Sequence, residues 1–232
     1  MPIAHVVSGG AQGSGPVSSV TTAGLNTTGA SLLVVTYARD SLFAAAATPI
    51  SDSNSNTWTA ATAEQGNAMA TGFCRQFYAK NPTVGAGHTF TFTLTGAGFP
   101  SIGVSAFSSA DTTAPLDQTA TGTDSTSPFA SPATGTLSQA DEAVVGAYTD
   151  SSVAEGIAVA GAYTAGFVAD GSATQEAIGH EWKIVSSTAA VTSEFTGANV
   201  DSADQVSTYK GAAAAAAQPY QPWMQRGPVL AQ

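Results

Sequence analysis

The stretch HTFTFTLTG, from His88 to Gly96, decides the fold class of this chain. Its apolar side chains alternate with threonines, which places Phe90, Phe92 and Leu94 on one face of an extended strand and the threonines on the other. One buried face and one face turned toward water is typical of an antiparallel sheet. The stretch therefore predicts an all-β protein.

Similar runs occur along the whole chain. They include MATGFCRQFYAK, SIGVSAFSS, EAVVGAYTD, TQEAIGHEWKIVSS and AAVTSEFTG. The run SLLVVTYAR, which begins at Ser31, is almost continuously apolar and predicts a central strand covered on both faces. Turn-forming clusters separate the runs, no segment shows convincing helical periodicity, and no internal repeat of fixed period is visible.

These patterns predict an antiparallel β-sandwich, jelly-roll-like, with about a dozen strands. We expect a single sandwich domain over residues 1–210, followed by an Ala/Pro-rich C-terminal arm over residues 211–232. The Thr-, Ser- and Pro-rich segment from Thr119 to Gly135 predicts a long surface loop.

Composition excludes two classes of partner. The net charge is −10, and Lys and Arg together number six. Nucleic acids and anionic membranes are bound by basic surfaces, so we expect neither as a partner. Charged residues make up 9% of the chain, against about 25% in typical soluble proteins, which favours a surface that makes uncharged contacts.

The segment SDSNSNTW places Asp52, Asn54 and Asn56 at the spacing that opens a calcium-binding loop. The Gly and Glu that such a loop requires further on are replaced by Thr57 and Ala63. The segment instead predicts a turn whose Asx side chains bond to the backbone.

Catalytic and cofactor motifs are absent from the sequence. His5, His88 and His180 belong to separate predicted strands, which argues against a zinc site. The lone Cys74 lies in an alternating run and is expected to be a small, half-buried strand residue. No nucleophile elbow or phosphate-binding loop occurs. We therefore expect no catalytic residue, no cofactor and no metal.

A family resemblance rests on the segments SDSNSNTW, FYAKNPTVGAGHTFTF, PSIGVSAFSSA and APLDQT, between Ser51 and Thr119. These resemble a β-sandwich module of tailed-bacteriophage virion proteins, which is also seen in secreted bacterial surface proteins. The resemblance implies a jelly-roll-like sandwich used for building or adhesion, and it transfers no catalytic residue.

Three functions follow as hypotheses. The N-terminus MPIAHVVSGG lacks the features of a secretory signal, which favours the phage setting and a chain made in the host cytoplasm. The first hypothesis is a non-enzymatic virion protein, a capsid decoration or a fibre or tail accessory, that forms homo-oligomers and docks on the capsid or tail lattice. The second is a carbohydrate-binding adhesin that exposes aromatic side chains to host surface glycans. The third is a polysaccharide-acting enzyme with a pair among the carboxylates Asp150, Glu155, Glu176 and Glu181.

The C-terminal segment STYKGAAAAAAQPYQPWMQRGPVLAQ carries the predicted partner contact. Six alanines are too few for a stable isolated helix, and the prolines after them favour extended backbone. Apolar side chains would be unfavourable in water, so we expect the arm to pack on its own sandwich or on a neighbouring subunit. The predicted contact residues are Tyr220, Trp223, Met224, Arg226, Val229 and Leu230.

Overall fold

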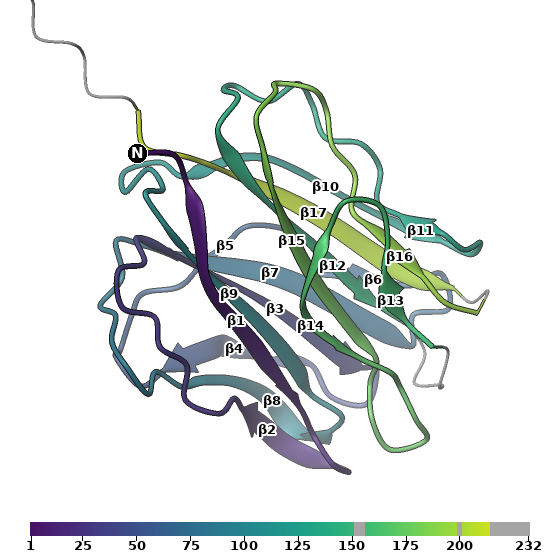
Figure 1. Ribbon diagram of the computed structural model, residues 1–232. Coiled ribbons are helices and arrows are strands. Elements are labelled where there is room, and N and C mark those ends of the chain that lie inside the picture. Colours follow the sequence, from purple (N-terminus) through teal and green to yellow (C-terminus); the bar gives the residue numbers. More distant parts are fainter. Residues whose placement is uncertain (151–155, 199–200, 214–232) are drawn as a thin grey trace, which may run out of the picture.

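The chain folds into four antiparallel sheets, and no helix occurs in the part that the structure describes (Figure 1). A computed structural model describes residues 1–150, 156–198 and 201–213. The prediction of an all-β antiparallel sandwich is confirmed.

Residues up to about Ala110 form two of the sheets. The first large sheet has the strand order β1-β9-β3-β7-β5, and β6 also pairs with β7. Its strands are β1 (Ala4–Gln12), β3 (Leu32–Asp40), β5 (Thr59–Ala60), β6 (Gln65–Gly66), β7 (Gly72–Lys80) and β9 (Ser101–Ser108). The first small sheet has the order β2-β8-β4. Its strands are β2 (Val17–Thr21), β4 (Ala45–Asp52) and β8 (Phe90–Gly98).

The rest of the described chain forms the other two sheets. The second large sheet has the order β10-β17-β12-β15-β14, and the second small sheet has the order β11-β16-β13. Their strands are β10 (Leu116–Asp124), β11 (Phe129–Ala130), β12 (Glu142–Thr149), β13 (Ala158–Val159), β14 (Thr164–Ala169), β15 (Ile178–Val185), β16 (Glu194–Thr196) and β17 (Ser202–Lys210).

The expected surface loop from Thr119 to Gly135 is wrong in two stretches, because its first residues belong to β10 and Phe129–Ala130 form the short strand β11, which pairs with β16. Thr119 to Asp124 belong to β10, which pairs with β17 along the edge of the second large sheet. The Thr, Ser and Pro content of the segment favours a loop, but alternating β-branched threonines suit an edge strand equally well.

The four sheets stack as small, large, large and small layers with an apolar cluster between each pair. Phe90, Phe92 and Leu94 are buried between the first small and first large sheets, as their alternation predicts. The two large sheets enclose a second cluster, and the second large and second small sheets enclose a third. Strand β3 lies in the middle of the stack and is buried along its whole length, which confirms the predicted central strand.

The two halves of the chain have the same topology. If β1, β9, β3, β7 and β5 are replaced by β10, β17, β12, β15 and β14, the order of the first large sheet becomes that of the second, and β6 has no counterpart. Replacement of β2, β8 and β4 by β11, β16 and β13 likewise converts the first small sheet into the second. We call residues 1–110 the first half and residues 111–213 the second half.

The equivalence of the halves extends to register. Phe92 pairs with Ile50 across the first small sheet, and Phe195 pairs with Val159 at the equivalent place in the second. Both edge strands, β1 and β10, carry a register shift near their first residues. Tyr37 of β3 stacks on Phe92 with ring centroids 4.3 Å apart, and in the other half a tyrosine of β12 lies 5.4 Å from Phe195.

The contact between the two large sheets is symmetric as well. Strand β7 packs on β17, and the equivalent β15 packs on β9. Tyr78 meets Tyr209 edge to face at 5.7 Å, and Trp182 meets Phe107 in the same way at 6.1 Å. The halves are therefore related by an approximate two-fold axis, as two subunits of a dimer would be.

Candidate binding groove

The carboxylate of Asp52 organises the loop that follows β4. Its Oδ2 accepts a hydrogen bond from Trp58 Nε1 at 2.8 Å, and its Oδ1 lies 2.9 Å from His88 Nε2. The backbone N–H groups of Asn54 and Asn56 also donate to this carboxylate. The predicted Asx turn is confirmed, and the segment SDSNSNTW is a device that fixes the position of the tryptophan.

The surroundings of Asp52 keep it ionised. Burial raises the pKa of its carboxyl, but hydrogen bonds from His88 and Trp58 outweigh that effect and hold the pKa below its ordinary value. On the other side of the ring, His88 Nδ1 lies 2.9 Å from Thr27 Oγ1. The series Asp–His–Thr has the order of a catalytic triad, yet Thr27 is fully buried and a substrate cannot reach its hydroxyl. We assign the series to loop anchoring.

Trp58 borders an open hollow of about 510 Å³ between β4, its following loop and β7. The hollow exists because the pairing of β4 with β8 shifts between Ala45 and Ile50, where Pro49 has no N–H to donate. A second hollow of about 450 Å³ adjoins the first. The two share the side chains of Ala47, Pro49 and Phe77, and we call them together the groove.

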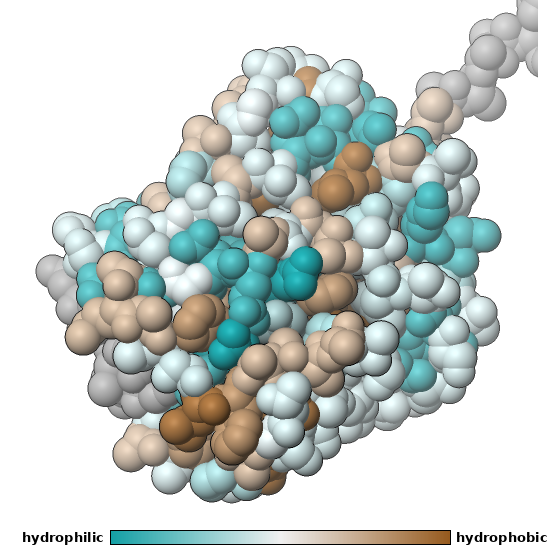
Figure 2. All heavy atoms as spheres, turned by 180° about the vertical axis from the view of Figure 1, so that it is seen from behind, coloured by the Kyte–Doolittle hydropathy of each residue, from teal (hydrophilic) through white to brown (hydrophobic). Residues whose placement is uncertain are grey.

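The groove lies on the side of the molecule that Figure 1 draws faint, where β4, β5, β6 and β7 are found. Figure 2 views the molecule from this side, and it shows apolar groups gathered in the lower part of the face beside a band of hydrophilic groups.

Free hydroxyl groups surround the tryptophan end of the groove. Thr48, Ser51, Ser55 and Thr57 are exposed and line the same hollow as Trp58. Their hydroxyls make no hydrogen bond to any residue that the structure describes, so they are available to a ligand. An indole ring amid uncommitted hydroxyls offers both an apolar surface and polar contacts.

The other end of the groove carries charge. Arg39 forms an ion pair with Glu64, with 2.6 Å between Nη2 and Oε2, and the hydroxyl of Tyr37 donates to Glu64 Oε1 at 2.6 Å. Burial raises the pKa of Glu64, but the hydrogen bonds from Arg39 and Tyr37 prevail and hold the pKa below its ordinary value. The charges of this pair therefore largely compensate each other.

Arg75 lies in the same hollow without an acidic partner in hydrogen-bond contact. Its Nε donates to the carbonyl of Thr62 at 2.8 Å, and its guanidinium carbon lies 5.0 Å from the centre of the Phe77 ring. These contacts fix the side chain at the floor of the groove. Its two terminal amino groups have no hydrogen-bond partner in the described chain.

The equivalent place in the second half is covered. Trp58 precedes β5 as Tyr163 precedes β14, and both strands pair with the equivalent strands β7 and β15. The ammonium of Lys183 lies 3.9 Å from the centre of the Tyr163 ring, and the hydroxyl of Tyr163 donates to the carbonyl of Thr192. The open groove is thus not a necessary product of the topology.

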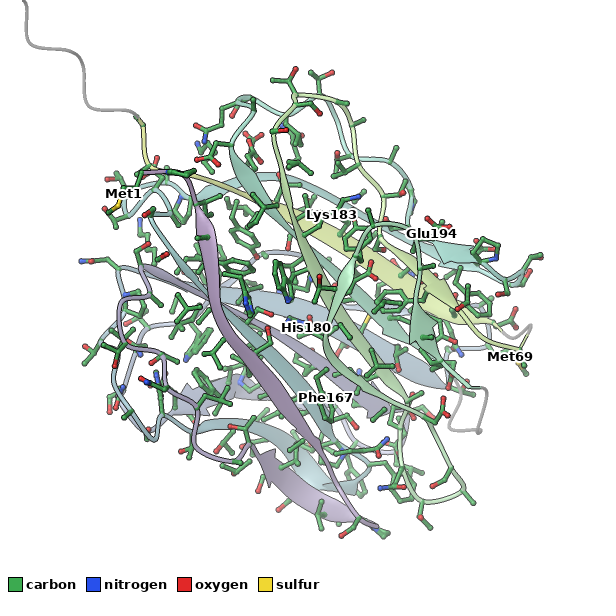
Figure 3. All side chains as sticks on the ribbon, viewed as in Figure 1. Met1, Met69, Phe167, His180, Lys183 and Glu194 are labelled. Atoms are coloured by element: carbon green, nitrogen blue, oxygen red, sulfur yellow. The ribbon has the colours of Figure 1, made fainter. Side chains whose placement is uncertain are left out.

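A chain of hydrogen bonds crosses between the two large sheets. His5 Nε2 lies 2.6 Å from Ser8 Oγ, which lies 2.8 Å from Ser105 Oγ. Ser105 continues to His180 at 2.8 Å, and His180 to Thr36 at 2.9 Å. His180 lies near the middle of the molecule in Figure 3, and burial lowers its pKa to about 3. None of these residues lines the groove, and we assign the chain of bonds to sheet packing.

The remaining sequence expectations concern metal ligands, membrane helices, Cys74 and the C-terminal arm. Among residues 1–150, 156–198 and 201–213, no three His, Cys, Asp or Glu side chains gather as metal ligands. The described part of the chain also has no helix long and apolar enough to cross a membrane. Cys74 is more deeply buried than expected, with no exposed surface. The arm residues Tyr220, Trp223, Met224, Arg226, Val229 and Leu230 lie outside the described residues.

Sequence reasoning missed the groove as a site. The sequence places Trp58 at the end of the motif SDSNSNTW, but it indicated no role for Arg75 or for the hydroxyls. The available indication was the run GFCRQF, in which alternation places Arg75 on the same strand face as Phe73 and Phe77. A cation between two aromatic residues on one face is an unusual placement and favours a partner or a ligand there.

Comparison with known proteins gave no match: no family model, no curated protein and no solved structure is similar to this chain. The resemblance to phage β-sandwich modules rests on the quoted motifs alone.

Proposed function

We propose that this chain is a non-enzymatic carbohydrate-binding module and that its ligand lies in the groove. The observation that carries the proposal is the setting of Trp58. Its indole nitrogen is bonded internally to Asp52, one part of the ring packs on Phe90 and the first apolar cluster, and the remaining half-exposed surface of the ring lines the hollow. Sugars present apolar C–H faces to aromatic rings and hydroxyls to polar groups, and the groove offers both. The hollows of about 510 and 450 Å³ lie within the range of about 300–1,000 Å³ that is usual for small-ligand sites.

The closed counterpart in the second half supports the same proposal. A tyrosine replaces the tryptophan there, and a lysine covers its ring. If the hollow were only a consequence of how the strands pack, we would expect the aromatic ring at this place to be covered, or left open, in both halves. The difference indicates that the first half keeps its groove open for a ligand.

The counterpart also supplies the control for the experiment. Binding to a glycan array, followed by calorimetric titration of the strongest ligand, is expected to be lost in Trp58→Ala and retained in Tyr163→Ala. Thermal melting of both variants checks that each is folded. Equal loss of binding in both folded variants, or no glycan binding by the unaltered chain, would contradict the proposal.

The hydroxyls provide a milder test. Thr48→Val and Thr57→Val remove groups that have no partner within the described chain, so stability should not change. Each is expected to weaken glycan binding roughly tenfold, because a lost hydrogen bond is worth about 1 kcal/mol or slightly more. Thr126→Val, at an exposed position outside the groove, should bind as the unaltered chain does.

Docking on a larger virion assembly is the second candidate function. One structural observation favours it. The backbone N–H of Gly211 donates to the carbonyl of Asp141 at 2.8 Å, and Ala213 lines a surface hollow together with Met1. The segment predicted to contact a partner therefore starts from the surface, at a place separate from the groove. Co-sedimentation with purified capsids and with tails would test this function, and fixed stoichiometry on one of them is the expected result.

A further inference from the structure

We infer that the groove is specific for acidic saccharides and that Arg75 binds a carboxylate of the ligand. This inference rests on the proposed carbohydrate-binding function and adds the chemical class of the sugar. It starts from an unbalanced charge: Arg39 and Glu64 form an ion pair, whereas Arg75 has no acidic partner in hydrogen-bond contact in the described chain.

The geometry around Arg75 is that of a prepared anion site. The bond from its Nε to the Thr62 carbonyl and its position over the Phe77 ring restrict the side chain. The two remaining amino groups form the fork that matches a carboxylate in a bidentate manner. A side chain that is already restricted loses less entropy when it binds.

The other charged groups of this hollow do not neutralise the positive charge of Arg75. Glu64 is the carboxylate that lines it, and both of its oxygens accept hydrogen bonds from Arg39, one of them also from Tyr37. The set of Arg39, Glu64 and Arg75 leaves one positive charge in a chain whose net charge is −10. Elsewhere the acidic surface repels anions, so this local charge would select where an acidic ligand binds.

The two ends of the groove then have separate tasks. The tryptophan and the free hydroxyls contact the sugar ring, and Arg75, at the far end of the shared wall of Ala47 and Pro49, contacts the acidic group. An oligosaccharide that carries a uronic or sialic acid one or more rings away from the stacked sugar fits this arrangement.

The test uses an array in which each uronic- or sialic-acid oligosaccharide is printed beside its carboxyl-reduced, neutral form. The full chain is expected to prefer the acidic member. In titrations with the strongest pair, Arg75→Gln should weaken the acidic ligand about ten- to hundredfold and leave the neutral form unchanged, because a hydrogen bond to a charged group is worth about 1.5–3 kcal/mol. Added salt should weaken the acidic ligand alone.

Lys210→Gln is the matched control. Lys210 is the last residue of β17 in the second large sheet and lines neither hollow of the groove, so its removal changes the net charge equally. It should not alter the preference. Two results would overturn the assignment of the carboxylate but not the proposed function. The first is that the chain binds acidic and neutral forms equally and Arg75→Gln does not change this. The second is that a folded Arg75→Gln variant loses affinity for both forms equally. Failure to bind any member of the array would overturn both.

Discussion

Asp52 and His88 are 36 positions apart and their side chains meet at 2.9 Å with no exposed surface on either. The contact ties the last residue of β4 to the segment just before β8. Because the same carboxylate holds Trp58, the pair fixes the wall of the groove as well as the edge of the first small sheet. The two most conspicuous motifs of the sequence, SDSNSNTW and GHTFTF, therefore act as one structural unit.

Replacing Asp52 with Ala is expected to destabilise the protein strongly. The change leaves the buried His88 ring and the Trp58 N–H without their shared acceptor, and each unsatisfied buried group costs about 1–3 kcal/mol. Chemical denaturation would measure the loss. Asp111→Ala is the control, because Asp111 accepts two backbone hydrogen bonds in a turn but is exposed to water. Equal effects of the two changes would contradict the anchoring role of Asp52.

Stability should fall as the pH rises above the acidic range. Burial raises the pKa of Glu181 from its ordinary value of 4.5 to about 9. The unfolded chain loses this proton near pH 4.5 and the folded chain keeps it, so folding becomes less favourable between these values, by up to about 1.4 kcal/mol per pH unit for one proton. Burial also raises the pKa of Glu142 and Asp204 to about 7, with the same sign.

Glu181→Gln isolates the contribution of Glu181. The glutamine retains an oxygen that accepts the Glu194 N–H, which lies 2.9 Å away in the unaltered protein. Melting temperatures of this variant should still fall up to about pH 7, where Glu142 and Asp204 lose their protons, and then level off. The unaltered chain should continue to lose stability up to about pH 9. Parallel curves for the two proteins above about pH 7 would show that Glu181 does not hold its proton.

The sequence predicted the fold class because alternation is local. The alternation of Phe90, Phe92 and Leu94 predicts a strand that is buried on one face, and the apolar run after Ser31 predicts a strand that is buried on both faces. The duplication was invisible because equivalent positions require only similar volume: Tyr78 corresponds to Trp182. Identical residues, such as Phe92 and Phe195, recur at too few equivalent positions for a fixed period to be visible in the sequence.

The groove could not be predicted from local sequence patterns, because it depends on contacts between distant segments. Trp58 could be recognised as part of a motif, but its exposure depends on where β4 leaves β8. Arg75 and Glu64 come together only through the pairing of β7 with β3 and β6. Glu64 is hydrogen-bonded by Arg39, and Arg75 has no acidic hydrogen-bond partner among the described residues; both facts depend on three-dimensional contacts.

Gly103 permits the close approach of the two large sheets. A methyl group added there would lie 2.5 Å from Cβ of His180, which belongs to the facing sheet and cannot move without its backbone. Gly103→Ala is therefore expected to destabilise the protein by about 1–3 kcal/mol. At Gly85 an added methyl meets no atom within 4 Å, so Gly85→Ala should be close to neutral. Denaturation midpoints that rank the two in the opposite order would refute the packing of His180 against β9.

The thiol of Cys74 should resist modification in the native protein. The side chain has no exposed surface, and burial raises the pKa of the thiol well above its ordinary value, which suppresses the reactive thiolate. Reaction with a colorimetric disulfide reagent should be negligible without denaturant and complete with it. Rapid labelling of the native chain would mean that β7 separates from the second large sheet in solution.

Removal of the C-terminal segment separates folding from assembly. The hydrogen-bonded structure extends to the backbone N–H of Ala212, which donates to the carbonyl of Ser109 at 2.7 Å. A chain that ends at residue 213 keeps this bond and every described strand, so its melting temperature should match that of the full chain. If residues 214–232 contact a neighbouring subunit or a virion lattice, the shortened chain should lose oligomers in sedimentation and lose co-sedimentation with capsids or tails, while glycan binding is unchanged. A large fall in melting temperature would instead show that the segment packs on its own sandwich.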